Sequence, residues 1–358
     1  MTRKLEKLEA LRGFAAIYVV LYHLFASGIV LFGINLTFLF KFGQEAVLLF
    51  FILSGFVITY SFEKSKDKSF KLFFCKRFFR IFIPLLIIFA TNILLLSLKE
   101  QQFIAIDFKN LFGNLLMLQD ISISKPRVIC DSFLNNLPLW SLSYEWYFYI
   151  LFFIFFLIFK NNKSQKVYMI AIIATITYLI YPNFINREVM YLSIWWLGGD
   201  IAILYLNKKA INFSNLRLSI FSLCVITILL FLNICIQGKL IFKDLNGLFC
   251  YHPWLEFRHF FTTLIIINTA LIWKKLNWIG FIQTFGMFNI FAPISFVIYI
   301  SHYFLIINAT YLNEFISNII LRYIIYFLVC VIFSYLVEKV IYVKINKFLM
   351  NLIYPKNS

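Results

Sequence analysis

The stretch LEALRGFAAIYVVLYHLFASG, residues 8–28, is apolar enough to cross a bilayer, yet it carries Arg12 and His23. A hydrocarbon core needs about 20 predominantly apolar residues per helix. Ionisable side chains inside such a segment cost free energy and usually mark a functional site. The stretch therefore predicts a transmembrane helix that takes part in chemistry.

The composition extends the membrane prediction to the whole chain. Of 358 residues, 62% are hydrophobic and 14% are charged, and the mean hydropathy is +0.86. So few charged residues cannot cover a water-soluble protein of this size. We expect an all-α polytopic membrane protein with about ten transmembrane helices, forming a single domain over residues 1–358 without an appended soluble domain. The predicted spans are 13–32, 44–61, 78–98, 139–159, 167–182, 188–206, 218–236, 259–273, 291–310 and 322–343.

The basic residues indicate the orientation. With a cytoplasmic N-terminus, 23 of the 33 Lys and Arg residues fall in cytoplasmic segments, as the positive-inside rule requires. We therefore expect N- and C-termini in the cytoplasm. The formal charge of +17 follows from the same asymmetry. It does not indicate nucleic-acid binding, because no basic stripe with interleaved aromatic residues lies on a soluble domain.

Four polar side chains on four predicted helices reach a similar depth. His23, Ser54, Glu145 and His302 each lie about 9–15 Å from the outer end of their segment, at 1.5 Å per residue. Arg12 precedes His23 by eleven residues, which is about three helical turns, so the two share one helix face. A buried neutral histidine near a carboxylate suits general-base catalysis. Glu145 could orient the imidazole or hold an acceptor hydroxyl.

The same residues carry a resemblance to a known family. LEALRGFAAIYVVLYH resembles the N-terminal signature of the integral-membrane acyltransferase family three, the O-acetyltransferases of bacterial surface glycans. The family's later elements match FFILSGF at 50–56, RFFRIFIP at 77–84, SLSYEWYFY at 141–149, and Tyr299 with His302. All five occur in the family order. In one departure, Pro84 lies one residue later than the family pattern places it.

The resemblance implies a fold and an activity. It implies ten transmembrane helices, a catalytic histidine at His23, and a multi-pass protein of the bacterial inner (cytoplasmic) membrane. It implies transfer of an acetyl or other short acyl group from cytoplasmic acyl-CoA, usually acetyl-CoA, to a hydroxyl of a cell-surface or lipid-linked glycan. Lipopolysaccharide, capsule polysaccharide, peptidoglycan, a lipid-linked intermediate and a small molecule all stay open as acceptors, as does the oligomeric state.

Roles for the other residues follow from their chemistry. Arg12, Arg77 and Arg80 are candidate ligands for the acyl-CoA phosphates, because arginine binds phosphate in a bidentate manner. Lipid headgroups are the other expected partners of these arginines.

We expect His23, Glu145 and Ser54 to be catalytic, with His23 taking the proton of the acceptor hydroxyl. Ser54, Tyr144 or Tyr149 could stabilise the oxyanion, and a covalent acyl intermediate on His23 or Ser54 stays open. Tyr149 and His302 are assigned to substrate binding, although an interhelical hydrogen bond explains His302 equally well.

No metal is expected. His252, Glu256 and His259 have a spacing that would place them on one helix face, but a polar rim that meets the acceptor is the simpler interpretation. Cys130 and Cys250 both fall in predicted outer loops, where a disulfide between them is a hypothesis.

A transporter or flippase for a lipid-linked glycan is the alternative function. Many spans with intramembrane charges fit it, but the sequence shows no inverted repeat and no pair of broken helices. Asp200, beside Gly198 and Gly199, is expected to serve helix packing, and Glu338 to pair with a basic neighbour.

Overall fold

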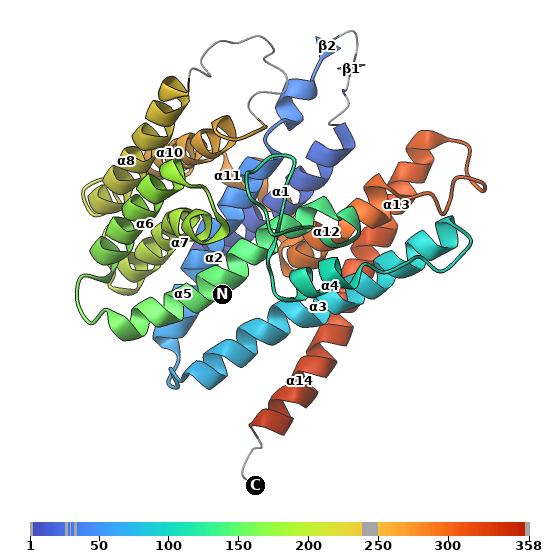
Figure 1. The fold of residues 1–358 in the computed structure, drawn as a ribbon, viewed down its shortest axis with the longest axis horizontal. Coiled ribbons are helices and arrows are strands. Elements are labelled where there is room, and N and C mark those ends of the chain that lie inside the picture. The colour runs from blue at the N-terminus through green and yellow to red at the C-terminus, as the bar shows by residue number, and fades with distance from the viewer. Residues whose placement is uncertain (1–2, 26–27, 29, 32–33, 238–249, 355–358) are drawn as a thin grey trace.

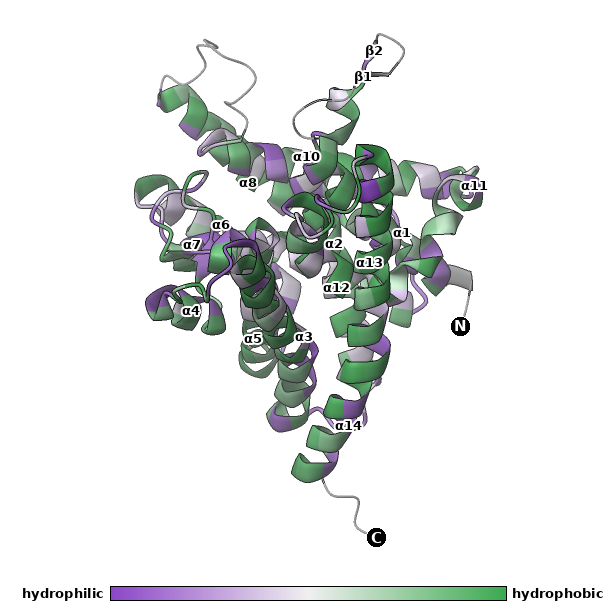
Figure 2. Cartoon of the chain, turned by 90° about the vertical axis from the view of Figure 1, so that its right-hand side faces the viewer, coloured by the Kyte–Doolittle hydropathy of each residue, from purple (hydrophilic) through white to green (hydrophobic). Residues whose placement is uncertain are grey.

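The computed structural model describes residues 3–25, 28, 30–31, 34–237 and 250–354, which form a helical bundle with two short β-ladders (Figure 1). Eight of the described helices are long and apolar enough to cross a membrane, or nine if one bent pair forms a span. Hydrophobic residues dominate the long helices, as Figure 2 shows for α3, α5 and α13. The predicted all-α polytopic membrane architecture is therefore confirmed.

The helices are α1 (Arg3–Phe25), α2 (Gly43–Lys64), α3 (Phe70–Lys99), α4 (Phe108–Leu115), α5 (Trp140–Ile158), α6 (Lys163–Ile180), α7 (Phe184–Leu206), α8 (Arg217–Ile236), α10 (Trp254–Lys275), α11 (Phe281–Phe285), α12 (Ser295–His302), α13 (Ile319–Tyr335) and α14 (Tyr342–Ile353). Strand β1 (Val30–Leu31) pairs antiparallel with β2 (Ile34–Asn35), and β3 (Gln119–Asp120) pairs parallel with β4 (Cys130–Asp131).

Each predicted span overlaps a helical segment, but the first, predicted at 13–32, is helical only to Phe25, with Val30 and Leu31 in β1 and residues 26–27, 29 and 32 outside the described residues. Two other segments differ from a simple transmembrane helix. The first turn of α6 carries Lys163 and Lys166, which shortens its apolar part. The segment predicted at 291–310 consists of a 3-10 turn, α12 and a π-helical turn at Tyr303–Ile307. It is bent by 42° relative to the helical segment Phe281–Ile290 before it. The cytoplasmic location of the termini stays a prediction.

The third predicted span begins earlier than expected. The expected start is residue 78, but α3 begins at Phe70, where the Ser69 side chain accepts a hydrogen bond from the Leu72 backbone N–H. The segment 70–77, in which Lys71, Lys76 and Arg77 interrupt apolar residues, thus continues the helix toward its N-terminus. Arg77 and Arg80 consequently lie within α3, three residues apart and on one side of it.

Helices α2 and α7 touch through their backbones. A Cβ atom added to Gly55 would lie 1.9 Å from the backbone oxygen of Trp195. A Cβ atom added to Gly198 would lie 1.9 Å from the backbone oxygen of Ile52. Small residues permit such close approach of membrane helices. The contact holds Ser54 against Trp195, whose indole N–H donates a hydrogen bond to the Ser54 hydroxyl (3.2 Å).

A buried ionic network ties the loop between α3 and α5 to the bundle. Asp120 lies 2.7 Å from Lys125 Nζ and 3.1 Å from Arg187 Nε, and all three side chains are at most 1% exposed. Tyr144 also donates a hydrogen bond to Asp120 (2.8 Å). Burial alone would raise the pKa of Asp120, but the two neighbouring cations lower this pKa below its usual value. The carboxylate therefore stays ionised and holds the loop on α5 and α7.

We expect Gly198→Ala to lower the free energy of unfolding by about 1–3 kcal/mol, because the added methyl group meets the Ile52 carbonyl and separates α2 from α7. Thermal unfolding of the detergent-solubilised protein measures this effect. Gly286→Ala is the matched control, since the nearest atom there belongs to the flexible Ile282 side chain at 3.3 Å. Equal unfolding midpoints for the two variants would contradict the backbone contact.

We expect Asp120→Asn to cost about 3–5 kcal/mol, because it leaves Lys125 and Arg187 buried without their counterion. Asp131→Asn, on an exposed residue of the same loop, is the control. The native pKa of Asp120 is depressed, so its stabilising effect is present near neutral pH and is lost as the pH falls below about 4. Unfolding midpoints measured against pH should fall more steeply in acid for the wild type than for Asp120→Asn.

Candidate active site

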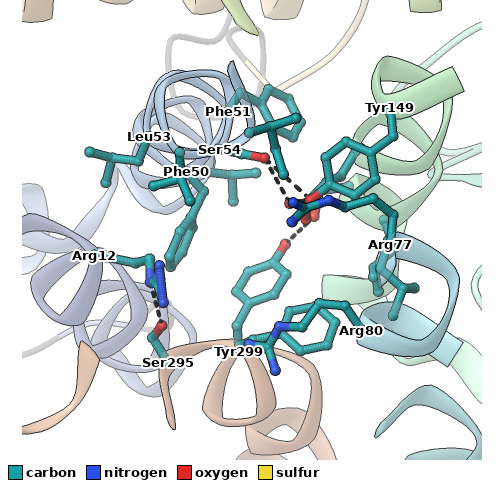
Figure 3. A pocket seen from close by; sticks show the side chains of 18 residues that line it. Arg12, Phe50, Phe51, Leu53, Ser54, Arg77, Arg80, Tyr149, Ser295 and Tyr299 are labelled. Atoms are coloured by element: carbon teal, nitrogen blue, oxygen red, sulfur yellow. Dashed lines mark hydrogen bonds between the residues drawn. The ribbon is translucent and has the colours of Figure 1, made fainter. Parts of the chain in front are cut away.

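A cavity of about 160 Å³ lies between five helices, which are α1, α2, α3, α5 and α12. Figure 3 shows Arg12 and Ser295 on one side of it, with Ser54, Arg77 and Tyr149 pointing toward one another on the other side. The polar lining residues are Arg12, Ser54, Arg77, Arg80, Ser141, Glu145, Tyr149, Ser295 and Tyr299. The three predicted phosphate-binding arginines thus share one cavity with three of the predicted active-site residues.

Ser54, Glu145 and Tyr149 form a hydrogen-bonded cluster. The Ser54 hydroxyl donates to Glu145 Oε1 (2.9 Å), and the Tyr149 hydroxyl donates to the same oxygen. The two hydroxyl oxygens lie 3.3 Å apart. Glu145 and Tyr149 lie one turn apart on α5, which places them on one face. A carboxylate in this position can take the proton of Ser54, so the cluster contains the elements of an activated serine.

The three arginines differ in their partners. Arg80 forms a two-pronged ion pair with Glu338, with Nη2 2.9 Å from Oε1. The expectation that Glu338 pairs with a basic neighbour is therefore confirmed. Arg12 donates to Ser295 Oγ (3.3 Å) and Arg77 donates to Ser61 Oγ (3.2 Å).

Arg77 has a hydrogen-bond donor that is available to bind an anion. Its Nε atom is buried and has no hydrogen-bond acceptor among the described residues. Within that part of the chain, neither Arg77 nor Arg12 belongs to an ion pair. A cavity bordered by three guanidinium groups, two of them without a carboxylate, favours a polyanionic ligand.

His23 and His302 form a pair of imidazoles with ring centroids 5.3 Å apart. His302 Nδ1 lies 2.8 Å from the Tyr299 carbonyl and 3.2 Å from the Ile298 carbonyl. Because a carbonyl only accepts, Nδ1 must carry the hydrogen, and Nε2 of the neutral ring is then an acceptor. That Nε2 atom is buried without a partner in the described part of the structure. The pair thus offers an unused basic nitrogen.

The histidine pair lies beside the cavity and not in its lining. Tyr299 connects the two, because its side chain lines the cavity and its ring centroid lies 6.3 Å from that of His302. Two roles were open for Glu145 from the sequence: it could orient the His23 imidazole or hold an acceptor hydroxyl. The structure joins Glu145 to Ser54 and Tyr149, and places His302 next to His23.

One residue considered for the site lies elsewhere, Ser141 of the SLSYE element joins the site, and Ser295 was missed. Tyr144, one of three residues considered for the oxyanion, donates instead to Asp120 in the outer network. Ser141 lines the cavity one turn before Glu145, and its hydroxyl lies 2.9 Å from the Tyr299 hydroxyl. Ser295, at the start of α12, was not singled out, although helical spacing places it on the same side as Tyr299.

The remaining polar candidates belong to separate networks. His252 Nδ1 lies 3.1 Å from Glu256 Oε2, whereas the His259 ring nitrogens contact Tyr191 (2.7 Å) and Gln44 (2.9 Å). In the described ranges, no group of three or more His, Cys, Asp or Glu residues could hold a metal ion.

Two further predictions concern single contacts. Cys130 and Cys250 both carry free thiols, so the disulfide considered between them is absent from the described structure.

Asp200 accepts hydrogen bonds from Ser164 (2.5 Å), Tyr168 (2.8 Å) and Ser219 (2.7 Å). The carboxylate of Asp200 thereby joins α6, α7 and the start of α8, as expected for a residue that serves helix packing.

Comparison with known proteins agrees with this geometry. The model of acyltransferase family 3, described as an acyltransferase domain, matches residues 5–339, which include the cavity and the histidine pair. No curated protein and no solved structure matches the chain. The family model covers nearly the whole chain, and the membrane-spanning helices make the protein multi-pass. The chain therefore belongs to acyltransferase family 3.

Proposed function

We propose that this protein transfers an acetyl or other short acyl group from cytoplasmic acyl-CoA to a hydroxyl of a cell-surface or lipid-linked glycan, in the bacterial cytoplasmic membrane. The single observation that supports this most is one cavity in which three arginines border the Ser54–Glu145–Tyr149 cluster. Family membership supports acyl transfer. The acetyl group and the glycan acceptor follow from the sequence resemblance.

In this proposal the arginines bind the phosphates of the donor. The buried Nε–H of Arg77 has no hydrogen-bond acceptor among the described residues, which costs free energy. A hydrogen bond to a phosphate oxygen would remove this cost. The cavity is smaller than most sites for whole small-molecule ligands. We therefore assign it to the acyl-pantetheine end of the donor, with the phosphates at the arginines that border it.

His23 acts as the general base. It takes the proton of the acceptor hydroxyl, whose oxygen forms a C–O bond with the thioester carbon. The C–S bond breaks, and CoA leaves as a thiolate that receives the proton from His23. His302 serves as a positioning residue, because its acceptor nitrogen can take the N–H of His23 and leave the other nitrogen of that ring free.

Ser54 offers a second route through a covalent acyl-enzyme. Glu145 takes the Ser54 proton, the serine oxygen bonds to the acyl carbon, the C–S bond breaks, and CoA leaves with the proton from Glu145. The acceptor hydroxyl then gives its proton to Glu145 and bonds to the acyl carbon, and the serine oxygen leaves with that proton as the free hydroxyl of Ser54. In that route a labelled acyl group stays on the protein when acceptor is withheld.

We expect His23→Ala to reduce acyl transfer by a factor of about 100 or more, because general-base catalysis contributes that much. Acetyl-CoA affinity should stay within twofold, since His23 lies outside the arginine-lined cavity. CoA release and mass spectrometry of the surface glycan measure transfer, and calorimetric titration measures affinity. His252→Gln, in the separate network with Glu256, is the histidine control.

His302→Ala should give a smaller loss than His23→Ala, and His302→Gln should restore part of it, because the amide oxygen can again accept a hydrogen bond. If His23→Ala removes the unmodified glycan from the cell surface, transport and not acyl transfer is the function.

We expect Arg77→Ala to weaken acetyl-CoA binding about 10–100-fold, because a hydrogen bond to a charged group contributes about 1.5–3 kcal/mol. Arg77→Lys should recover only part of the affinity, since lysine lacks the bidentate geometry. Lys76→Ala, which removes the exposed neighbouring cation, is the control for total charge. Equal losses for Arg77→Ala and Lys76→Ala would show that only overall charge matters and would contradict a phosphate site at Arg77.

A further inference from the structure

A second cavity, of about 470 Å³, lies between the end of α3 and the loop that follows the π-helical turn. Its volume lies within the range of typical small-molecule sites. The polar residues that line it include Lys99, Gln101, Asn308, Thr310 and Glu314. We propose that this cavity is the acceptor site and binds a saccharide, an inference that rests on the proposed function.

The two cavities lie toward opposite ends of α3. Arg77 and Arg80 border the first, whereas Leu95 and Gln101 border the second. Arg80 and Leu95 are separated by about 22 Å along the helix axis. Figure 1 shows the C-terminal end of α3 next to the loop that precedes α13. A donor in the first cavity and an acceptor in the second therefore approach from different ends of the bundle.

The histidine pair lies between the two cavities. On one side, Tyr299 lines the first cavity and contacts His302 with a ring centroid distance of 6.3 Å. On the other side, Phe304 lines the second cavity, and its ring lies 6.1 Å from that of Tyr303. The Tyr303 ring lies 5.7 Å from the His23 ring. Two aromatic side chains, Phe304 and Tyr303, thus lie between the second cavity and the proposed base.

The lining matches a compound with many hydroxyl groups. Gln101, Asn308 and Thr310 each combine hydrogen-bond donors with acceptors, as sugar hydroxyls do. Their side chains make no hydrogen bond within the described residues, so this capacity is free for a ligand. Lys99 and Glu314 have opposite charges, which favours an acceptor without a large net charge.

Aromatic and aliphatic groups complete the second cavity. Phe304 and Tyr311 contribute aromatic side chains to the lining, and Leu98 is an exposed apolar residue of the lining beside the end of α3. The saccharide hydroxyl loses its proton to His23 and bonds to the acyl carbon, and CoA leaves with that proton. Both a soluble glycan and a lipid-linked one supply this chemistry.

The test uses the full chain in lipid nanodiscs, with two probes as acceptors. One probe is the mixture of neutral oligosaccharides released from the surface glycan of cells that carry the chain, and the other is a prenyl-linked oligosaccharide. We expect Asn308→Trp, which fills the second cavity, to raise the KM for the acceptor at least about tenfold and to leave acetyl-CoA affinity within twofold. Asn308→Ala is the milder variant and should raise this KM about fivefold, because it removes one hydrogen-bonding group.

Glu100→Trp is the matched control, since Glu100 is exposed next to the cavity but does not line it. Dependence on Asn308 with the prenyl-linked probe alone identifies a lipid-linked acceptor, and dependence with the released oligosaccharides identifies a free glycan. Unchanged acceptor KM in both Asn308 variants overturns the proposed acceptor site. A wild-type protein that neither binds acetyl-CoA nor releases CoA overturns the proposed function instead, so the two failures are distinguishable.

Discussion

Direct contact between helix backbones at glycine is the constraint on which the site depends. Gly55 and Gly198 bring α2 against α7, and a Cβ atom on Gly13 would lie 2.0 Å from the Phe288 carbonyl. Gly13 follows Arg12, and Gly55 follows Ser54. In both cases the polar side chain is next to a glycine whose backbone touches the backbone of the neighbouring segment. Small-residue contacts of this kind fix the position of a polar group inside a membrane more firmly than lipid-facing packing does.

Hydrogen bonding distinguishes the carboxylates of Asp200 and Asp120 from two atoms of the site, although unpaired buried polar atoms also occur outside the site among the described residues, as in Glu188 and at Arg187 Nη2. Asp200 accepts three hydrogen bonds, and Asp120 is surrounded by two cations and a tyrosine. By contrast, Arg77 Nε and His302 Nε2 are buried without partners among the described residues. Such unpaired buried atoms are rare in native proteins and call for an explanation. Here both belong to groups to which we assign donor binding or proton transfer.

Helical periodicity predicted much of the fold and part of the site. It gave the segments that became the long helices, the common face of Arg12 and His23 on α1, and the pairing of Glu338. Periodicity fixes depth and helix face but not which helices are neighbours, so it could not separate His23 from Glu145. Tyr144 adjoins Glu145 and therefore points about 100° away from it, which accounts for its place in the outer network. The bend before α12 has no signal in the hydrophobic pattern.

The ion pair between Arg80 and Glu338 has a consequence for turnover. Acyl-CoA and the CoA that remains after transfer carry the same phosphates, so a site that held them tightly would retain its product. Glu338 is almost fully buried, and it can return to Arg80 each time the phosphates withdraw. Under the donor binding that we propose, every association exchanges one anion for another at Arg80, and the carboxylate of Glu338 limits how long CoA stays bound.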